Sequence, residues 1–233
     1  MKQVINSHND FFSYSFSLDC VIFGYKEGKL YVLLIERNIE PFKGYWAVPG
    51  DLIKKDENLK EAAKRILFDL TKLKHVKLHQ ARTFGKPDRH PLGRVITCAY
   101  MALVNIGEMK AEPSSWASNV KWEPVHEVSG LAFDHDKILK SSTKLLKNKL
   151  ENEPVCFNLL PKNFIISELQ DLYEYVFCKT LDKANFRKKI KKLPLTLLDQ
   201  KQKNVKHRPS KLYTFDEEEY FRKIKEEDYR FKM

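Results

Sequence analysis

Residues 183–211 carry almost the whole net charge of the chain, and this constrains how the stretch can fold. Eleven lysines and arginines stand here against one acid, Asp199, so the local net charge is +10, beside +11 for all 233 residues. Phe186, Ile190 and Leu193 have the spacing of one apolar face, which predicts a helix over residues 181–193 that ends before a proline. Such a density of cations is the electrostatic footprint expected of a surface that binds nucleic-acid phosphates.

The elements around this basic helix are predicted to form a small module. Ser167 is expected to cap a preceding helix that runs to Val176. Residues 195–198 and 211–215 are predicted strands of a hairpin, and its tip is the basic loop 201–209. Helix, turn, helix and basic hairpin in this order are typical of a winged helix-turn-helix domain.

Polar and basic side chains of the second helix and of the hairpin tip are the residues that we expect to contact DNA. They are Lys183, Asn185, Arg187, Lys188, Lys191, Lys192, Lys201, Lys203, Lys206, His207 and Arg208. Asn185, Arg187 and Lys188 are expected to read base edges, since Asn and Arg form bidentate contacts with adenine and guanine. The other lysines are expected to hold phosphates. A merely solvated basic surface is the alternative.

The first two thirds of the chain predict a mixed domain of strands and helices. The expected strands cover residues 17–23, 30–35, 80–84, 94–104 and 120–124, and the expected helices cover residues 56–70 and 134–150. Strands and helices together predict an α+β protein. Pro154 ends the second helix, so we expect two domains, residues 1–152 and 153–233.

No apolar run approaches the roughly 20 residues that span a bilayer, and the N-terminus lacks a secretory signal. We therefore expect a cytoplasmic protein without membrane contact.

Gly50, Asp56 and the predicted helix after them resemble a Nudix box. Its pattern is a Gly, five residues, a Glu, seven residues, and then Arg-Glu-apolar-x-Glu-Glu-x-Gly-apolar. With Gly50 as the first residue, the acidic positions of the helix fall on Arg65, Phe68 and Asp69. Nudix enzymes gather Mg²⁺ with carboxylates at these positions. Since one carboxylate of three remains and a cation at position 65 repels a metal, we expect no metal, no cofactor and no hydrolase activity.

Further segments are similar to signatures of Nudix-related transcriptional regulators. They are residues 83–96, 157–161, 185–189 and 207–213. This resemblance spans both parts of the chain and implies a Nudix-like α/β/α sandwich followed by a winged helix-turn-helix domain. It also implies a homodimeric repressor on palindromic double-stranded operator DNA, which is released from the operator when an effector binds.

Members of this family differ in their effector. Some control NAD metabolism and respond to ADP-ribose-like nucleotides, and others control carbohydrate utilisation, including an L-arabinose-responsive group. Because the missing carboxylates would hold a diphosphate through Mg²⁺, we expect a pentose, namely L-arabinose. Sugar hydroxyls are best held by carboxylates, amides and lysines over an aromatic platform. The expected effector-binding residues are Lys43, Trp46, Asp51, Asp56, Asp69, Phe84 and Asp88.

Other functions stay open at this point. A regulator of NAD metabolism that senses ADP-ribose is one of them. A Nudix hydrolase of a nucleoside diphosphate derivative is another, and it would use Asp56 and Asp69 with a further carboxylate such as Glu61. A non-specific RNA-binding protein would need exposed aromatic residues among the basic ones. Phe186 is the single aromatic residue within 183–211, and its spacing assigns it to the core.

Overall fold

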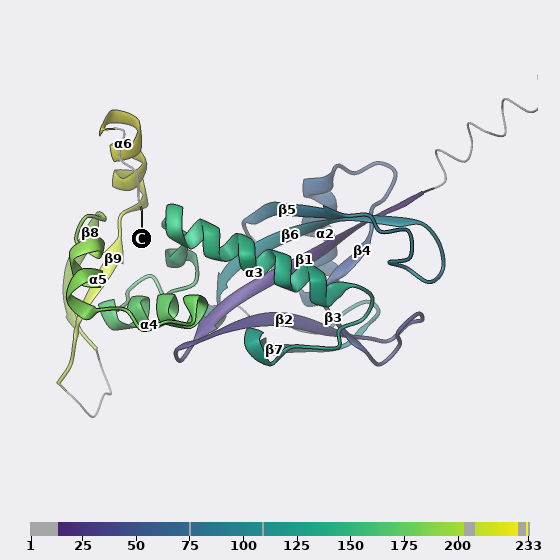
Figure 1. The fold of residues 1–233 in the computed structure, drawn as a ribbon, viewed down its shortest axis with the longest axis horizontal. Coiled ribbons are helices and arrows are strands. Elements are labelled where there is room, and N and C mark those ends of the chain that lie inside the picture. Colours follow the sequence, from purple (N-terminus) through teal and green to yellow (C-terminus); the bar gives the residue numbers. More distant parts are fainter. Residues whose placement is uncertain (1–13, 75, 109, 203–207, 228–231, 233) are drawn as a thin grey trace, which may run out of the picture. The chain divides into compact units, whose positions relative to one another are not determined.

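The computed structural model describes residues 14–74, 76–108, 110–202, 208–227 and 232. The chain divides into two compact units (Figure 1). The first comprises the described residues of Met1–Phe23, Val32–Leu103 and Met109–Thr143, and the second those of Gly24–Tyr31, Val104–Glu108 and Lys144–Met233.

A seven-stranded sheet forms the core of the first unit. Its main path runs β3-β2-β1-β6-β5, with β4 paired to β1 and β7 paired to β2. The strands are β1 (Ser15–Lys26), β2 (Lys29–Arg37), β3 (Trp46–Ala47), β4 (Gly50–Leu52), β5 (Leu78–Phe84), β6 (Val95–Asn105) and β7 (Ala117–Pro124). β1 and β6 are apolar and buried along nearly their whole length, because both lie in the middle of the sheet.

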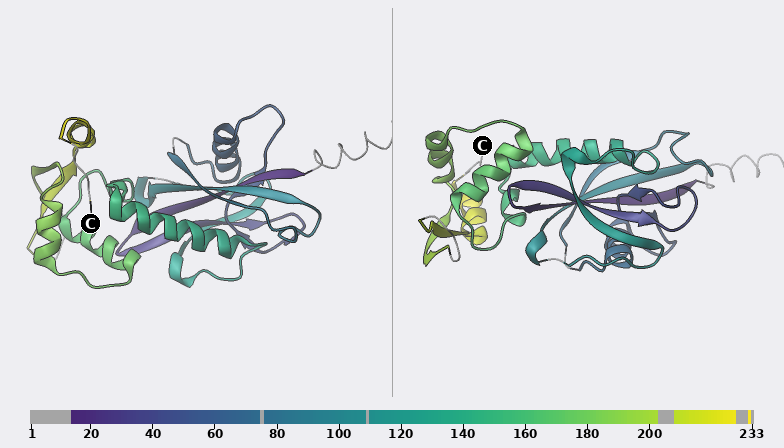
Figure 2. Two further views of the ribbon diagram at one scale, coloured as in Figure 1. Left: turned by 45° about the horizontal axis from the view of Figure 1, so that its top comes forward. Right: turned by 90° about the horizontal axis from the view of Figure 1, so that it is seen from below.

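Helices cover both sides of this sheet (Figure 2). α2 (Leu59–Thr71) lies on one side and the first half of α3 (His135–Asn152) on the other. Asn58 caps α2 through a capping box with Glu61. The helix predicted over residues 56–70 is confirmed as α2, and it buries Ala63, Ile66, Leu67 and Leu70 on one face, while Leu59 is half-buried.

The second unit contains the predicted helix-turn-helix and hairpin. α4 (Ile166–Phe177) and α5 (Lys183–Ile190) are followed by the antiparallel strands β8 (Leu195–Lys201) and β9 (Lys211–Phe215) and by α6 (Glu217–Glu227). Tyr173 and Phe186 join the two helices edge to face, with ring centroids 5.9 Å apart. Phe157 stacks on Phe215 with centroids 4.0 Å apart. Aromatic packing therefore joins α4 to α5, and joins the segment before α4 to β9.

Several boundaries differ from those predicted. Ser167 does not cap α4: the helix begins at Ile166, and the carboxylate of Glu168 accepts a hydrogen bond from the backbone N–H of Ile165. α5 ends at Ile190 because the chain tightens into a turn in which Leu193 N–H donates to Ile190 O. β3, β4 and α6 were not predicted, since the two strands are too short for a period and α6 is mostly charged.

Short 3₁₀ helices cover Ile106–Glu108, Val125–Glu127 and Val155–Asn158. Within the described residues, none of the helices has the length and apolar character to cross a bilayer.

Candidate functional site

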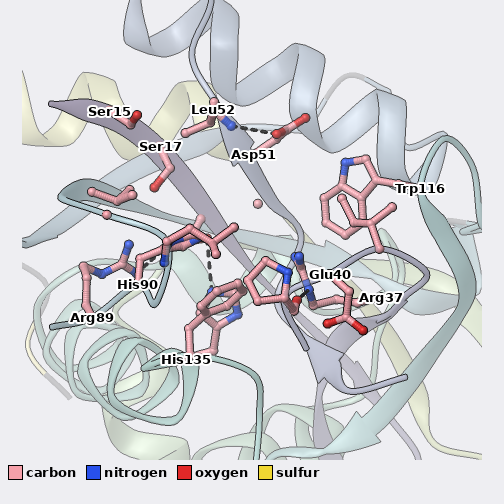
Figure 3. A pocket seen from close by; sticks show the side chains of 18 of the residues that line it. Ser15, Ser17, Arg37, Glu40, Asp51, Leu52, Arg89, His90, Trp116 and His135 are labelled. Atoms are coloured by element: carbon pink, nitrogen blue, oxygen red, sulfur yellow. Dashed lines mark hydrogen bonds and ion pairs between the residues drawn. The ribbon is translucent and has the colours of Figure 1, made fainter. Parts of the chain in front are cut away.

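A cleft of about 420 Å³ opens in the first unit beside the ends of β1, β2 and β4. Its volume lies within the range of about 300–1,000 Å³ that is usual for small-molecule sites. Figure 3 shows Arg37 and Trp116 on one side of the cleft and Arg89 and His90 on the other. Phe133 also lines it and stacks on His90, with ring centroids 5.0 Å apart. The cleft therefore combines aromatic walls with arginines.

Arg37 is the last residue of β2 and is 8% exposed. Its guanidinium carbon lies 5.0 Å from the Trp116 ring centroid and 4.8 Å from that of Phe133. Nε donates a hydrogen bond of 2.9 Å to Pro41 O. Asn38 N–H donates to Trp116 O, which brings the tryptophan beside the end of β2. The guanidinium is thus held in a fixed orientation by two rings and one carbonyl.

A buried polar network underlies the cleft and is centred on Asp19 of β1. One carboxylate oxygen accepts a 2.7 Å hydrogen bond from Thr97 Oγ1 and lies 3.5 Å from a terminal nitrogen of Arg89. The other lies 3.4 Å from Nε2 of His135. Arg89 also pairs with Asp134 at 2.7 Å. Because each charge of this network has a partner within the network, we assign it a structural role: it stabilises the residues that lie beneath the cleft.

The protonation state of His135 follows from its surroundings. Nδ1 accepts a hydrogen bond of 3.2 Å from the Val48 backbone N–H, so the proton of the neutral imidazole sits on Nε2 and faces Asp19. Burial lowers the pKa of His135, with a smaller opposing effect from the carboxylate of Asp19. His135 therefore serves as a neutral link between β1, the β3–β4 turn and α3.

The structure brings one of the predicted effector residues into this cleft, namely Asp51. Lys43, Asp56 and Asp88 are exposed in loops and do not line it. Trp46 is half-buried under Lys121, whose Nζ lies 4.3 Å from its ring centroid. Phe84 is half-buried near Arg82. Arg37, Trp116 and Phe133 were not predicted, because they come from separate segments of the chain. Arg89 and His90 lie in the family-like segment 83–96, but no role in the cleft was predicted for them.

Asp69 lies outside the cleft as well, and it reveals an error in the predicted register of the Nudix box. Nε of Arg65 donates a 2.7 Å hydrogen bond to Glu57, and a terminal nitrogen lies 3.6 Å from Asp69. Lys72, at the end of α2, has the left-handed φ of 61° that the pattern assigns to a glycine. The pattern therefore begins at Asp51, one residue later than predicted, with Glu57 and Arg65 as its Glu and Arg.

In the corrected register, the acidic positions of α2 fall on Ile66, Asp69 and Leu70 rather than on 65, 68 and 69. Ile66 and Leu70 are fully buried, and neither carries an oxygen ligand. The argument that a cation at position 65 repels a metal is wrong, because Arg65 stands where the pattern itself has an arginine. Across the described residues, no group of three or more His, Cys, Asp and Glu side chains could hold a metal ion. Of the positions 66, 69 and 70, only Asp69 offers a carboxylate to a divalent cation.

A second hollow, of about 790 Å³, lies in the second unit between the start of α4, α5 and the hairpin. Arg187 and Lys188 line it from α5, Lys191 lines it from the residue that follows α5, and Lys211 lines it from β9. Lys191 lies four residues after Arg187 and three after Lys188, which places it beside both side chains. A groove with several exposed cations along one wall is suited to the sugar-phosphate backbone of a nucleic acid.

The remaining predicted DNA-contact residues are distributed more widely. Lys183, Lys192, Lys201 and Arg208 are exposed. Asn185 is exposed too, but it lines a different hollow, of about 210 Å³, together with Tyr173 and Phe177. The structure thus does not place it in the hollow of Arg187 and Lys188. Lys203, Lys206 and His207 lie outside the described residues.

Comparison with known proteins accounts for both parts of the chain. Residues 15–146 match the family described as NUDIX domain, and residues 156–215 match the NrtR DNA-binding winged helix domain. The chain is 32% identical over 219 residues to the ADPR responsive transcriptional repressor NtrR of Acinetobacter baylyi, a match that covers 91% of this chain and 86% of that protein.

Solved structures give the same result. The crystal structure of Shewanella oneidensis NrtR complexed with a 27mer DNA is similar with a TM-score of 0.75 and 28% identity, over 93% of this chain and 97% of that chain. The NUDIX domain of Shewanella oneidensis NrtR complexed with ADP ribose is similar with a TM-score of 0.54 and 31% identity, over 57% of this chain and 89% of that chain. The predicted fold, a Nudix domain followed by a winged helix, is confirmed. This chain belongs to the NrtR-type regulators, which join a Nudix domain to an NrtR winged helix domain.

Proposed function

We propose that this protein is a transcriptional repressor that binds double-stranded operator DNA and leaves it when ADP-ribose binds to the Nudix domain. The observation that carries the proposal is similarity over nearly the whole chain to a repressor described as ADPR responsive. The likeness to an NrtR complexed with DNA and to a NUDIX domain complexed with ADP ribose supports its two halves separately.

The effector proposed here differs from the pentose expected from the sequence, and the comparisons give no support to L-arabinose or to control of carbohydrate utilisation. The pentose was preferred because a diphosphate seemed to need Mg²⁺. The cleft supplies arginines and aromatic rings instead, and guanidinium groups pair well with phosphate oxygens. His90 and Trp116 line the cleft with flat rings against which an adenine can pack.

Isothermal titration calorimetry of the whole chain with ADP-ribose and with L-arabinose tests the effector. We expect saturable binding of ADP-ribose and no heat with L-arabinose. Binding of L-arabinose alone would overturn the assignment, and absence of binding to both would leave no support for a nucleotide sensor. Dimerisation on a palindromic operator is part of the proposal, and light scattering with and without DNA measures it.

For DNA, we propose that Arg187 and Lys188 of α5 and Lys191 just after it contact the duplex, with Lys183, Lys192, Lys201 and Arg208 as further contacts. Each of these side chains is exposed. The non-specific RNA-binding alternative is less favoured, because Phe186 is 3% exposed and thus offers no stacking surface. An affinity for promoter DNA that is insensitive to salt would contradict the proposed phosphate contacts.

We also propose that the Nudix domain does not hydrolyse its ligand. Ile66 and Leu70 stand where the pattern of the box has carboxylates, and Asp69 is engaged with Arg65. A phosphate-release assay coupled to a phosphatase, with ADP-ribose and excess Mg²⁺, is expected to give the rate of the protein-free blank. A rate that rises in proportion to protein concentration would show that hydrolase activity remains and would favour the enzyme alternative.

A further inference from the structure

Arg37 differs from the other arginines of the cleft in how its charge is balanced. Arg89 is paired with two carboxylates, those of Asp19 and Asp134. Arg94 is half-exposed, so water solvates it, and one terminal nitrogen donates to Gly85 O at 2.6 Å. Arg37 is 8% exposed, and within the described part of the chain no hydrogen bond or ion pair engages its two terminal nitrogens.

The surroundings of Arg37 leave its charge only partly compensated. The carboxylates of Asp51, Asp19 and Glu40 attract it through space, but none of them lies within ion-pair distance of it. Burial lowers the pKa of the guanidinium, and these three carboxylates oppose that effect. A mostly buried cation with no carboxylate in contact is less well compensated than one in an ion pair, so an anion that enters the cleft supplies the closer counter-charge.

The guanidinium of Arg37 is held so that its terminal nitrogens can donate hydrogen bonds to a ligand in the cleft. Trp116 and Phe133 hold its carbon at 5.0 and 4.8 Å from their ring centroids, and Pro41 O engages Nε. The terminal nitrogens are left as donors on the wall of the 420 Å³ cleft, where Figure 3 shows the side chain. Because the orientation is fixed before binding, little side-chain entropy is lost when an anion arrives.

We propose that Arg37 is the anion-binding residue of this cleft and that it holds a diphosphate directly, without a divalent cation. The inference rests on the proposed function for the identity of the natural ligand. A planar fork of donors matches phosphate oxygens in two parallel hydrogen bonds. Nudix enzymes use Mg²⁺ to neutralise the same charge, and in this chain Ile66 and Leu70 occupy the positions where the metal ligands would stand.

The first test uses inorganic pyrophosphate and ADP-ribose with the full-length protein in EDTA and in Mg²⁺. We expect pyrophosphate to compete with ADP-ribose in EDTA, and we expect the affinity for ADP-ribose to change less than about 2-fold when Mg²⁺ is added. A requirement for Mg²⁺, or bound ADP-ribose that pyrophosphate does not displace, would overturn the inference.

The second test compares R37Q with K43Q, each of which removes one cation. Lys43 is exposed and lies outside the cleft lining, so K43Q controls for the change in net charge. We expect R37Q to bind ADP-ribose about 10- to 100-fold more weakly and K43Q to bind it like wild type, the loss expected of a hydrogen bond to a charged group. R37K, which keeps the charge but not the fork, is expected to lie between wild type and R37Q. Wild-type affinity in R37Q would refute the role.

Three outcomes are distinguished in these experiments. If circular dichroism shows R37Q to be unfolded, R37K and the metal-free pyrophosphate titration of wild type decide the question. If wild type binds pyrophosphate through Arg37 but does not bind ADP-ribose in either buffer, the proposed effector fails while the anion site stands. If ADP-ribose binds and R37Q binds it equally well, the effector stands and the anion site fails.

Discussion

Nε of Arg65 donates a hydrogen bond of 2.7 Å to the carboxylate of Glu57, which lies eight residues earlier and just before α2. A terminal nitrogen of the same guanidinium donates to Leu52 O at 3.0 Å. Arg65 therefore ties the loop that follows β4 to the first half of α2. Glu57 Oε1 in addition accepts from the backbone N–H of Lys54, so the carboxylate closes that loop from both sides.

This pair predicts a specific loss of stability in acid. The hydrogen bond from Arg65 lowers the pKa of Glu57 from 4.5 to about 2. Because the folded pKa is below the unfolded one, the stabilisation is complete above about pH 4.5 and is lost as the pH falls from there towards 2. We expect the free energy of unfolding, measured by urea denaturation, to fall less steeply over this range in E57Q than in wild type. Parallel slopes for the two proteins would contradict the account.

Gly50 predicts a second effect on stability, through close approach to Asp19. A Cβ at position 50 would lie 2.0 Å from the Asp19 carboxylate, which is buried and held by Thr97. We expect G50A to lose about 1–3 kcal/mol, the usual cost of overpacking, by displacing that carboxylate. G85A is the matched control, because a Cβ there meets no atom closer than 3.9 Å. Equal unfolding midpoints for G50A and wild type would show that Asp19 is not confined as described.

A third prediction concerns which side of α5 faces DNA. Arg187 lines the large hollow beside the hairpin, whereas Asn185 lines a separate one. We expect R187A to weaken binding to promoter DNA and to lower the slope of log K against log salt by about 1. N185A is expected to have a smaller effect. K140A, an exposed lysine of α3, controls for net charge. A larger loss in N185A than in R187A would place the other side of the helix on the duplex.

Features of the fold could be predicted from the sequence where the pattern that indicates them lies within a single helix or strand. The basic helix with Phe186 and Ile190 on its buried face was predicted because its period lies within one element. The helix over residues 56–70 was predicted for the same reason, and as α2 it buries Ile66 and Leu70. The register of the Nudix box was missed by one residue. The prediction took Gly50 as the glycine of the pattern, whereas the spacing of Glu57 and Arg65 matches the pattern one residue later.

The cleft itself was not predictable from local patterns. Arg37, Trp116 and Phe133 are far apart in the chain and meet only because Asn38 N–H bonds to Trp116 O and the loop before α3 returns to β2. Acidic residues such as Asp56 and Asp88 looked suitable for a sugar, but each is exposed outside the cleft. The effector class was consequently inferred from missing metal ligands. Arg37, which we propose balances the charge of the ligand in place of the metal, was not noticed in the sequence.

The central claim is that ligand binding in the Nudix domain controls DNA binding by the winged helix. Fluorescence anisotropy of labelled promoter DNA, titrated with the full chain at constant salt, measures this coupling directly. We predict that saturating ADP-ribose weakens the affinity for DNA by about 5-fold or more, the usual range for coupled sites, and that L-arabinose leaves it unchanged. An unchanged affinity for DNA under conditions in which calorimetry shows the protein saturated with ADP-ribose would contradict the account.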